Sequence, residues 1–199
     1  MSKGEQTRVR IVDRAWRLAS RDGLSGLSLG KLADELGLSK SGLFAHFGSK
    51  EELELEVLKA AQAAFVEEVV RPALSAQRGI PRLRKLFKHW QAWMNDPSRP
   101  GGCIFLAASA ELDDGDGPQR DLVVGSQAAM LAMLSRAASL AVEERQFRAE
   151  LDCDQFAFEM LGIALVYHHS KRLLRDPKAD QRARVAFDAL LAASSTASN

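Results

Sequence analysis

Two short helical patterns with a glycine between them, within residues 28–47, constrain this sequence more than any other feature. Ser28 is a favourable N-cap residue, because its hydroxyl can accept a hydrogen bond from a free amide of the first helical turn. Gly37 supplies the left-handed residue that commonly ends a helix. Between them, apolar residues recur with the i, i+3, i+4, i+7 spacing of one helical face, namely Leu29, Leu32, Ala33 and Leu36. A short amphipathic helix is therefore predicted here.

A second short helix follows at once, with Ser39 as its N-cap. Leu43 and Phe47 lie four residues apart, so both side chains are expected on the same, inward face. The outward face is then left to Lys40, Ser41, Phe44 and His46. Two short helices joined by a tight glycine turn form a helix-turn-helix motif.

An earlier segment supplies the third helix that a small core of this kind needs. Its apolar residues have the same helical spacing, and the segment ends near Asp22-Gly23. These inward-facing positions are Ile11, Ala15, Leu18 and Ala19. We therefore predict a three-helix helix-turn-helix domain in residues 1–48.

The second helix of a helix-turn-helix motif places its first turn in the major groove of DNA. Lys40 and Ser41 are therefore predicted to contact base edges, and Phe44 a thymine methyl group or a sugar. The alternatives are that Lys40 touches only phosphate and that Phe44 packs in the core of the domain. Residues at helix starts or beside this helix are predicted to contact phosphate oxygens, and they are Ser28, Ser39, His46 and Lys50.

The charge distribution agrees with a DNA-binding N-terminal part. Residues 1–50 hold nine Lys or Arg against five Asp or Glu, a formal charge of +4. Residues 51–199 hold eighteen against twenty-one, a formal charge of −3. The basic surplus therefore lies at the end of the chain that is predicted to meet phosphate.

Residues 8–55 resemble the DNA-binding domain of the tetracycline-repressor (TetR) family of bacterial regulators. The resemblance rests on the Gly37-Leu38-Ser39 turn and on residues 43–53, which read Leu-Phe-Ala-His-Phe-Gly-Ser-Lys-Glu-Glu-Leu. Two residues depart from the family pattern, because Phe44 stands where tyrosine is usual and Gly42 where threonine or serine is common. The resemblance therefore implies a DNA-binding domain and leaves the operator sequence open.

The composition is that of a globular protein of the cytoplasm. The 199 residues are 46% hydrophobic and 27% charged, which excludes disorder as the main state. Cys103 and Cys153 lack the spacing of a zinc site, so no metal, other cofactor or disulfide framework is predicted. The N-terminus is polar, so no secretion signal is predicted. No run of eighteen apolar residues occurs, so no membrane span is predicted.

Residues 49–199 are predicted to form a second, all-helical domain. Ser49 and Glu52 have the spacing of a capping box, and a helix of about twenty residues follows without a breaker as far as Pro72. Pro177 is expected at the first position of the last helix. The other helical segments are expected at residues 79–96, 103–112, 119–148, 154–175 and 177–193. The predicted fold is all-α, with about nine helices.

A second, shorter stretch extends the resemblance into this domain. Residues 101–105 read Gly-Gly-Cys-Ile-Phe, and residues 111–114 read Glu-Leu-Asp-Asp. They are similar to a stretch found in part of the TetR family, where it opens the short sixth helix of the effector domain. The similarity implies a helical-bundle domain for effector binding and dimerisation, and it does not identify the ligand.

Large, soft side chains are frequent in this second domain. Methionine and aromatic residues suit an adaptable apolar pocket, although at helical spacing they can equally form only a core. Cys103, between two glycines and a helix, is also a candidate sensor of electrophiles or oxidants. The candidate contacts for a small apolar effector are Phe65, Trp90, Trp93, Met94, Cys103, Phe105, Met130, Met133, Leu134, Phe158 and Tyr167.

A homodimer is expected, because one helix-turn-helix unit covers only half of a two-fold symmetric DNA site. The last two long helices carry the apolar residues for the interface, and Gly162 and Ala164 would let helices approach closely. The resemblance to the TetR family implies a four-helix bundle between subunits at this place. The predicted interface residues are Phe156, Met160, Ile163, Tyr167, Ala183, Phe187, Leu190 and Leu191.

These patterns together predict a DNA-binding transcriptional regulator and not an enzyme. We expect a repressor that binds a palindromic double-stranded DNA operator as a dimer and is released by a small apolar molecule. Two other classes stay open from the residues alone. One is a dimeric helical interaction protein that has lost DNA binding, and the other is an enzyme with Cys103 as its nucleophile.

Overall fold

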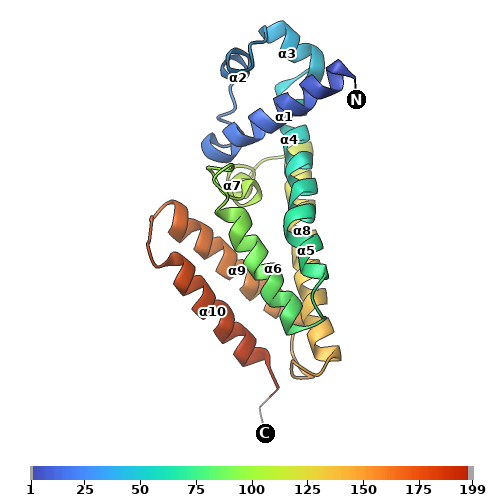
Figure 1. Ribbon diagram of the computed structural model, residues 1–199, viewed down its shortest axis with the longest axis vertical. Coiled ribbons are helices and arrows are strands. Elements are labelled where there is room, and N and C mark those ends of the chain that lie inside the picture. Colours follow the sequence, from blue (N-terminus) through green and yellow to red (C-terminus); the bar gives the residue numbers. More distant parts are fainter. Residues whose placement is uncertain (1, 197–199) are drawn as a thin grey trace. The chain divides into compact units, whose positions relative to one another are not determined.

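The computed structural model describes residues 2–196, in which the regular structure is helical (Figure 1). The all-α prediction is confirmed, and within these residues β-type pairing is limited to an isolated bridge between Phe147 and Ser195. The helices form two compact units. Unit 1 contains the chain as far as Ala64 together with Asn95–Ser126, and unit 2 contains Phe65–Met94 and the chain from Gln127 onward.

Unit 1 contains the predicted helix-turn-helix. All four inward positions of the first helix are buried, as are Leu43 and Phe47 of the third. In the second helix Leu32 and Ala33 are buried, whereas Leu29 is half-buried. The helices of this unit are α1 (Lys3–Asp22), α2 (Leu29–Leu36), α3 (Lys40–Phe47), most of α4 (Lys50–Phe65), α7 (Ile104–Glu111) and the start of α8 (Pro118–Glu143).

The helix ends in the motif are made by the predicted residues. Ser28 Oγ accepts a hydrogen bond from the Lys31 amide at 3.4 Å, and Ser39 Oγ accepts one from the Gly42 amide at 3.0 Å. Gly37 ends α2 with φ 66°, a left-handed conformation that a residue with a Cβ adopts only under strain. The turn between α2 and α3 therefore follows from local chemistry.

The helix after the motif is longer than predicted. α4 continues through a π-helical turn, η1 (Val66–Val70), into α5 (Arg71–Leu74), so the helix passes Pro72 instead of ending there. Proline lacks an amide hydrogen and its ring clashes with the carbonyl four residues earlier in an α-helix. The wider turn, in which the Arg71 amide bonds to the Val66 carbonyl five residues earlier, lies directly before the proline.

Residues 95–103 pack against the end of α1 within unit 1. The guanidinium of Arg99 lies 5.6 Å from the ring centroid of Trp16 and forms an ion pair with Asp96 at 2.5 Å. A Cβ on Gly101 would lie only 1.1 Å from the carbonyl oxygen of Ser20, so this glycine touches the α1 backbone directly. The segment before α7 is therefore seated on α1 by a contact that only glycine permits.

Unit 2 has a core of aromatic pairs. The ring of Phe65 meets Trp93 edge-on at 5.3 Å and Trp90 at 6.3 Å, and Phe87 stacks on Phe187 at 4.1 Å. Such pairs contribute about 0.5–1.5 kcal/mol each beyond their burial. The helices here are η1, α5, α6 (Ile80–Met94), the rest of α8, α9 (Cys153–Arg172) and α10 (Ala179–Ser194).

Two predicted helix boundaries in unit 2 are wrong. α8 ends at Glu143 and not near residue 148, because Arg145 adopts a left-handed φ of 58° and the buried Phe147 turns back to pair with Ser195. α10 begins at Ala179 and not at Pro177. The turn before it is held by Asp176, whose carboxylate accepts hydrogen bonds from the Lys178 amide and from Arg182.

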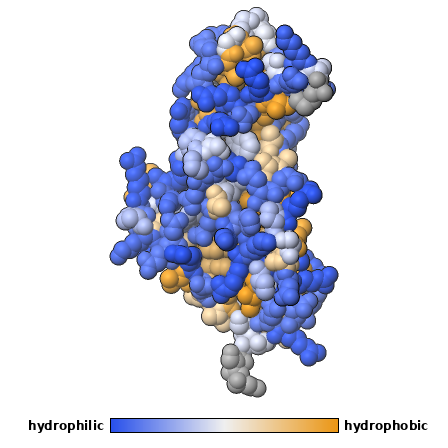
Figure 2. Space-filling model, viewed as in Figure 1, coloured by the Kyte–Doolittle hydropathy of each residue, from blue (hydrophilic) through white to orange (hydrophobic). Residues whose placement is uncertain are grey.

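One helix, α8, is long and apolar enough to cross a bilayer by length and composition alone, with a mean hydropathy of 1.2 in its most apolar window. This is weak support for a membrane span, because core helices of water-soluble bundles have the same composition. Blue, hydrophilic residues cover most of the face shown in Figure 2.

Candidate DNA-binding and effector sites

The first turn of α3 presents the predicted DNA-reading residues to solvent. Lys40 and Ser41 are exposed, and Ser41 Oγ lies 3.1 Å from Ser39 Oγ. Phe44 is 40% exposed, so the alternative that it fills the core of the domain is wrong. Leu43 and Phe47 occupy the core instead. α3 therefore has one buried edge and one free face of mixed cationic, hydroxyl and aromatic character.

Lys40 on this face has no ion-pair partner among residues 2–196. Among residues 2–196, no carboxylate lies within 4 Å of Lys31 or Lys40, whereas Arg14 forms an ion pair with Glu35 at 2.6 Å. The hydrogen bond from Arg14 is the largest cause that lowers the pKa of Glu35, which stays ionised. Sequence reasoning missed Lys31, although its exposed position in the first turn of α2 is readable from the pattern. Lys40 is therefore free to meet phosphate, whereas the charge of Lys31 also acts on the carboxylates of Asp22 and Glu35, where it helps to lower the pKa.

Two predicted phosphate contacts are placed differently. Lys50 is half-buried, and its Nζ donates to the Ser25 carbonyl at 2.9 Å and pairs with Glu54 at 3.5 Å. His46 is also half-buried, and its carbonyl accepts a hydrogen bond from Arg8. The Lys50 prediction does not fit this placement, because its ammonium group is already engaged inside unit 1.

Arg8 is a structural residue that sequence reasoning did not identify. Its guanidinium lies 4.4 Å from the ring centroid of Phe47, which is a cation–π contact, and it forms an ion pair with Glu56 at 3.2 Å. Together with its bond to the His46 carbonyl, these contacts join α1 to α3 and α4. Arg8 therefore stabilises α3 through contacts with its last two residues, His46 and Phe47.

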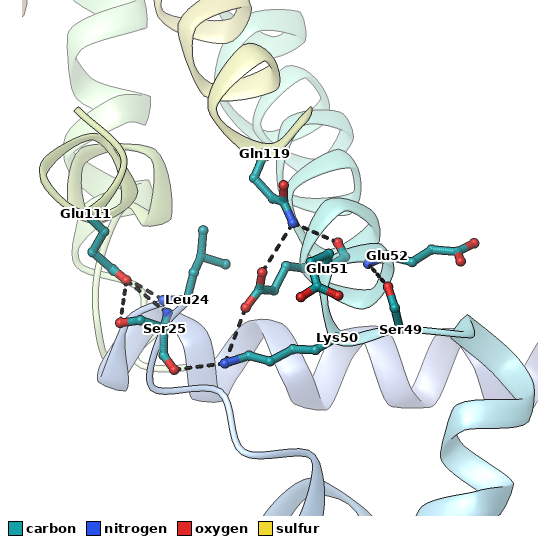
Figure 3. A network of polar contacts seen from close by, with 9 residues as sticks. Leu24, Ser25, Ser49, Lys50, Glu51, Glu52, Glu111 and Gln119 are labelled. Carbon is teal, nitrogen blue, oxygen red and sulfur yellow. Dashed lines mark hydrogen bonds and ion pairs between the residues drawn. The ribbon is translucent and has the colours of Figure 1, made fainter. Parts of the chain in front are cut away.

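A carboxylate at the end of α7 holds the loop between α1 and α2 (Figure 3). Glu111 accepts hydrogen bonds from the amide of Leu24 at 3.2 Å, the amide of Ser25 at 3.0 Å and the hydroxyl of Ser25 at 2.9 Å. A Cβ on Gly23 would lie 2.6 Å from Glu111 Oε1, so the glycine leaves room for the carboxylate. We name Glu111, Leu24 and Ser25 the α7 clasp.

A second set of contacts joins the start of α8 to the start of α4 (Figure 3). Gln119 Nε2 donates to the Glu51 carbonyl at 3.1 Å and to Glu54 Oε2 at 3.3 Å. Burial raises the pKa of Glu54, while Lys50 and Gln119 act in the opposite direction. Within unit 1, polar contacts between residues far apart in sequence therefore connect α7 to the helix-turn-helix and α8 to the start of α4.

The predicted effector contacts are divided between the two units. Cys103 and Phe105 belong to unit 1, whereas the other nine belong to unit 2. Phe158 is 67% exposed, so its prediction as a pocket residue is wrong. Tyr167 is buried and donates to Asp180 at 2.7 Å. The remaining members are buried or half-buried in unit 2, and they are Phe65, Trp90, Trp93, Met94, Met130, Met133 and Leu134.

Unit 2 contains an apolar cavity of about 140 Å³ between η1 and α5, α6 and α8. Met133 lines it, together with aliphatic side chains that were not predicted as ligand contacts. Arg82 and Arg136 also line the cavity. It is therefore a small, mostly aliphatic space with guanidinium groups in its wall. Its wall residues come from three segments, at residues 70–74, 82–86 and 133–140, so no single sequence pattern predicts it.

A larger groove of about 730 Å³ runs between α9 and α10 in unit 2. Four predicted interface residues line it, and they are Ile163, Tyr167, Ala183 and Leu190. The other four predicted interface residues do not line the groove and are buried in the core of the unit, namely Phe156, Met160, Phe187 and Leu191. Helical spacing alone does not separate the face toward the core from the face toward a partner.

The groove has an exposed apolar wall and a polar end. Val166 lines it and is 65% exposed. At the polar end, the hydrogen bond from Lys171, followed by the one from Tyr167, lowers the pKa of Asp180 against the effect of burial. Asp180 is therefore ionised at neutral pH and ties α9 to α10.

Cys103 and Cys153 are both present as thiols. Cys103 is buried at the N-terminus of α7, and burial raises the pKa of the Cys153 thiol. Within residues 2–196, no group of three His, Cys, Asp or Glu side chains is arranged to hold a metal ion.

Two family models match the chain, one after the other. Residues 11–57 match the family model described as "Bacterial regulatory proteins, tetR family", and residues 79–187 match "Tetracyclin repressor-like, C-terminal domain". Over 65 residues the chain is 33% identical to the HTH-type transcriptional regulator AcrR of Shigella flexneri. That match covers 33% of this chain and 30% of AcrR, so the chain spans less than a third of that relative.

Solved structures share the whole fold. A TetR transcriptional regulator from Chloroflexus aurantiacus has a TM-score of 0.86 at 22% identity, covering 96% of each chain. A TetR-family regulator from Cytophaga hutchinsonii has a TM-score of 0.86 at 18% identity, covering 100% of this chain and 99% of its own. AibR, solved in complex with isovaleryl coenzyme A and operator DNA, has a TM-score of 0.72 at 24% identity, with coverage of 92% and 95%.

An N-terminal helix-turn-helix followed by a larger all-helical part defines a class of two-part DNA-binding regulators. With both family models matched, the chain belongs to the tetracycline-repressor (TetR) family of bacterial transcriptional regulators. Members of this family are regulators of transcription and not enzymes.

Proposed function

We propose that this protein is a ligand-responsive repressor of the cytoplasm that binds a palindromic operator as a homodimer. The observation that carries the proposal is the exposed first turn of α3, where Lys40, Ser41 and Phe44 face solvent and no carboxylate of residues 2–196 neutralises Lys40. Ser28 and Ser39 supply helix starts beside it. AibR, which shares the fold, was solved with both an acyl coenzyme A and operator DNA, which supports the two activities together.

The α9–α10 groove is the proposed dimer interface. Most of its wall residues are small or aliphatic, which allows helices of a second copy to approach closely. Val166 and Ile163 would bury apolar surface that is open to water in one copy. Two copies would then offer two α3 helices to the two halves of a palindromic site.

The proposed switch uses the connections inside unit 1. The helix that begins at Lys50 continues without a break to Leu74, so one element includes residues of both units. The α7 clasp and Gln119 hold the loop and helix starts around the helix-turn-helix. A small apolar effector that favours the DNA-incompetent arrangement would change operator affinity tenfold for each 1.4 kcal/mol of differential binding.

The direct test is a fluorescence-anisotropy titration of the protein against DNA that flanks its own gene, at several salt concentrations. Saturable binding to a palindrome that weakens steeply with salt is expected, with a scrambled duplex as the control. Equal, weak binding to both duplexes would contradict the proposal. It would favour the alternative of a helical dimeric protein that no longer binds DNA.

The Lys40→Ala variant is expected to bind the operator about 5- to 150-fold more weakly, which corresponds to 1–3 kcal/mol for a base contact. If Lys40 meets only phosphate, the loss will be similar on all sequences and the salt dependence will fall by about one counterion. The Lys59→Ala variant is the matched control, because Lys59 lies on α4 and pairs with Glu56. Unchanged affinity and salt dependence in Lys40→Ala would remove Lys40 from the DNA interface.

The Glu111→Gln variant is expected to loosen the loop between α1 and α2, because an amide cannot accept all three hydrogen bonds of the α7 clasp. Amide hydrogen exchange at Leu24 and Ser25 should become about tenfold faster, which corresponds to a loss of about 1.4 kcal/mol in local stability. Asp114→Asn, a neighbouring exposed carboxylate, is the control. Equal exchange in the two variants would show that the clasp does not restrain the loop.

A further inference from the structure

We propose that the cavity between α5, α6 and α8 binds a short apolar anion whose carboxylate pairs with Arg82. This inference rests on the proposed function, because it names the chemical class of effector that the regulator would detect. It follows from three features of unit 2, namely the size of the cavity, the lining of its walls and the state of the Arg82 side chain.

The walls of the cavity suit a compact hydrocarbon body. Val70 and Leu74 come from the end of η1 and from α5, Leu86 from α6, and Met133 and Leu140 from α8. The volume is about 140 Å³, and the space is open to solvent on one side, where Leu74 is 56% exposed. The body of the ligand is therefore a single ring or a short alkyl chain.

Arg82 lies in this wall with a charge that no acid neutralises. Its Nη2 donates to the carbonyls of Ala76 at 3.1 Å and Leu74 at 3.4 Å. Its Nε is buried and has no hydrogen-bond acceptor, and no carboxylate of residues 2–196 lies within 4 Å of the guanidinium. A buried donor of a charged group without an acceptor is costly, so the protein gains free energy when an anion supplies one.

The second guanidinium in the wall does not have this property. Arg136 Nη1 donates to Glu143 at 2.7 Å and to Ser139 at 3.2 Å, so its charge is already matched. A carboxylate is a suitable partner for Arg82, because one of its oxygens can accept a charge-assisted hydrogen bond from the Nε that lacks an acceptor. The two arginines therefore have different roles, and Arg82 is the one that selects an anion.

The position of the cavity connects it to the proposed switch. Val70, which lines the cavity, is the last residue of the π-helical turn η1. π-turns inside α-helices occur frequently at functional sites, because the helix there has an alternative hydrogen-bond register. A ligand in contact with Val70 touches the continuous helix that begins at Lys50, directly after the helix-turn-helix.

Calorimetric titration of the full-length protein with benzoate and hexanoate tests the proposal, with benzamide and hexanamide as uncharged analogues of the same shape. Both carboxylates are expected to bind, and the amides at least tenfold more weakly. The Arg82→Gln variant should bind a carboxylate no better than the wild type binds the matching amide. The control is Arg84→Gln, because Arg84 also lies on α6 but pairs with Asp188. This variant should bind the carboxylates as the wild type does.

Arg82 also holds two carbonyls, so the Arg82→Gln variant needs a second variant that keeps the fold. Ala137→Leu fills the cavity from α8 without altering Arg82, and it should abolish binding of both carboxylates. Failure of both carboxylates to bind, equal binding of acids and amides, or unchanged binding in Arg82→Gln would each overturn the proposal. Operator binding is measured separately by anisotropy, so loss of the regulatory function and loss of the anion site are distinguishable.

Discussion

The Phe47→Ala variant is expected to lose about 3–5 kcal/mol in the free energy of unfolding of unit 1 and, with it, DNA binding. Phe47 is 2% exposed in the core of the helix-turn-helix, and its ring also makes a cation–π contact with the guanidinium of Arg8. Removing the ring therefore leaves a cavity and also removes the support of Arg8 on α3. Urea denaturation followed by circular dichroism measures the loss.

The Phe44→Ala variant separates folding from DNA binding. Phe44 lies only three residues before Phe47 but on the exposed side of α3, so its removal should change the free energy of unfolding by less than about 1 kcal/mol. Its operator affinity should fall, because an apolar contact to the DNA is lost. A large stability loss in Phe44→Ala, or a small one in Phe47→Ala, would contradict the assignment of the two faces.

The Gly101→Ala variant is expected to destabilise unit 1 by roughly 3 kcal/mol or more, although it adds one methyl group. The new Cβ would lie 1.1 Å from the Ser20 carbonyl oxygen and 1.8 Å from its carbon, and backbone atoms cannot move aside as a flexible side chain can. Residues 95–103, which lead into α7, would therefore lose their contact with the backbone of α1. The midpoint of thermal unfolding measures this effect.

Gly125→Ala is the matched control for this experiment. Gly125 lies within α8, and a Cβ there would have no heavy atom within 4 Å. Alanine is the better helix former, so this variant should be about 0.5–1 kcal/mol more stable than the wild type. Similar effects of the two substitutions would show that the contact between Gly101 and Ser20 is not a constraint on the fold.

The helix-turn-helix could be predicted almost completely from the sequence. Ser28, Gly37 and Ser39 act through hydrogen bonds and backbone conformations that lie within a few residues, so the helix ends appear in the pattern itself. Leu43 and Phe47 are buried as their spacing indicates. Local chemistry is sufficient there, because each helix needs only one apolar face.

The sequence indicates less about which residues of unit 2 form an interface or a pocket, and the reason is physical. Its long helices have apolar residues on more than one face, so spacing does not show which face is covered by the same chain. Phe156 and Met160 were expected at a subunit interface and lie in the core, whereas Phe158 was expected in a pocket and lies on the surface. Only the packing of the other helices decides between these faces.

The sequence by itself determined the all-α class, the reading helix with Lys40 and Phe44 outward, and the membership of the family. Only the tertiary structure showed the α7 clasp, the engagement of Lys50 with the Ser25 carbonyl, and the cavity with the unneutralised Arg82. The difference is one of range. Caps and helix faces arise from residues within about one or two turns, whereas a carboxylate 86 residues away or a cavity between three helices exists only after the chain has packed.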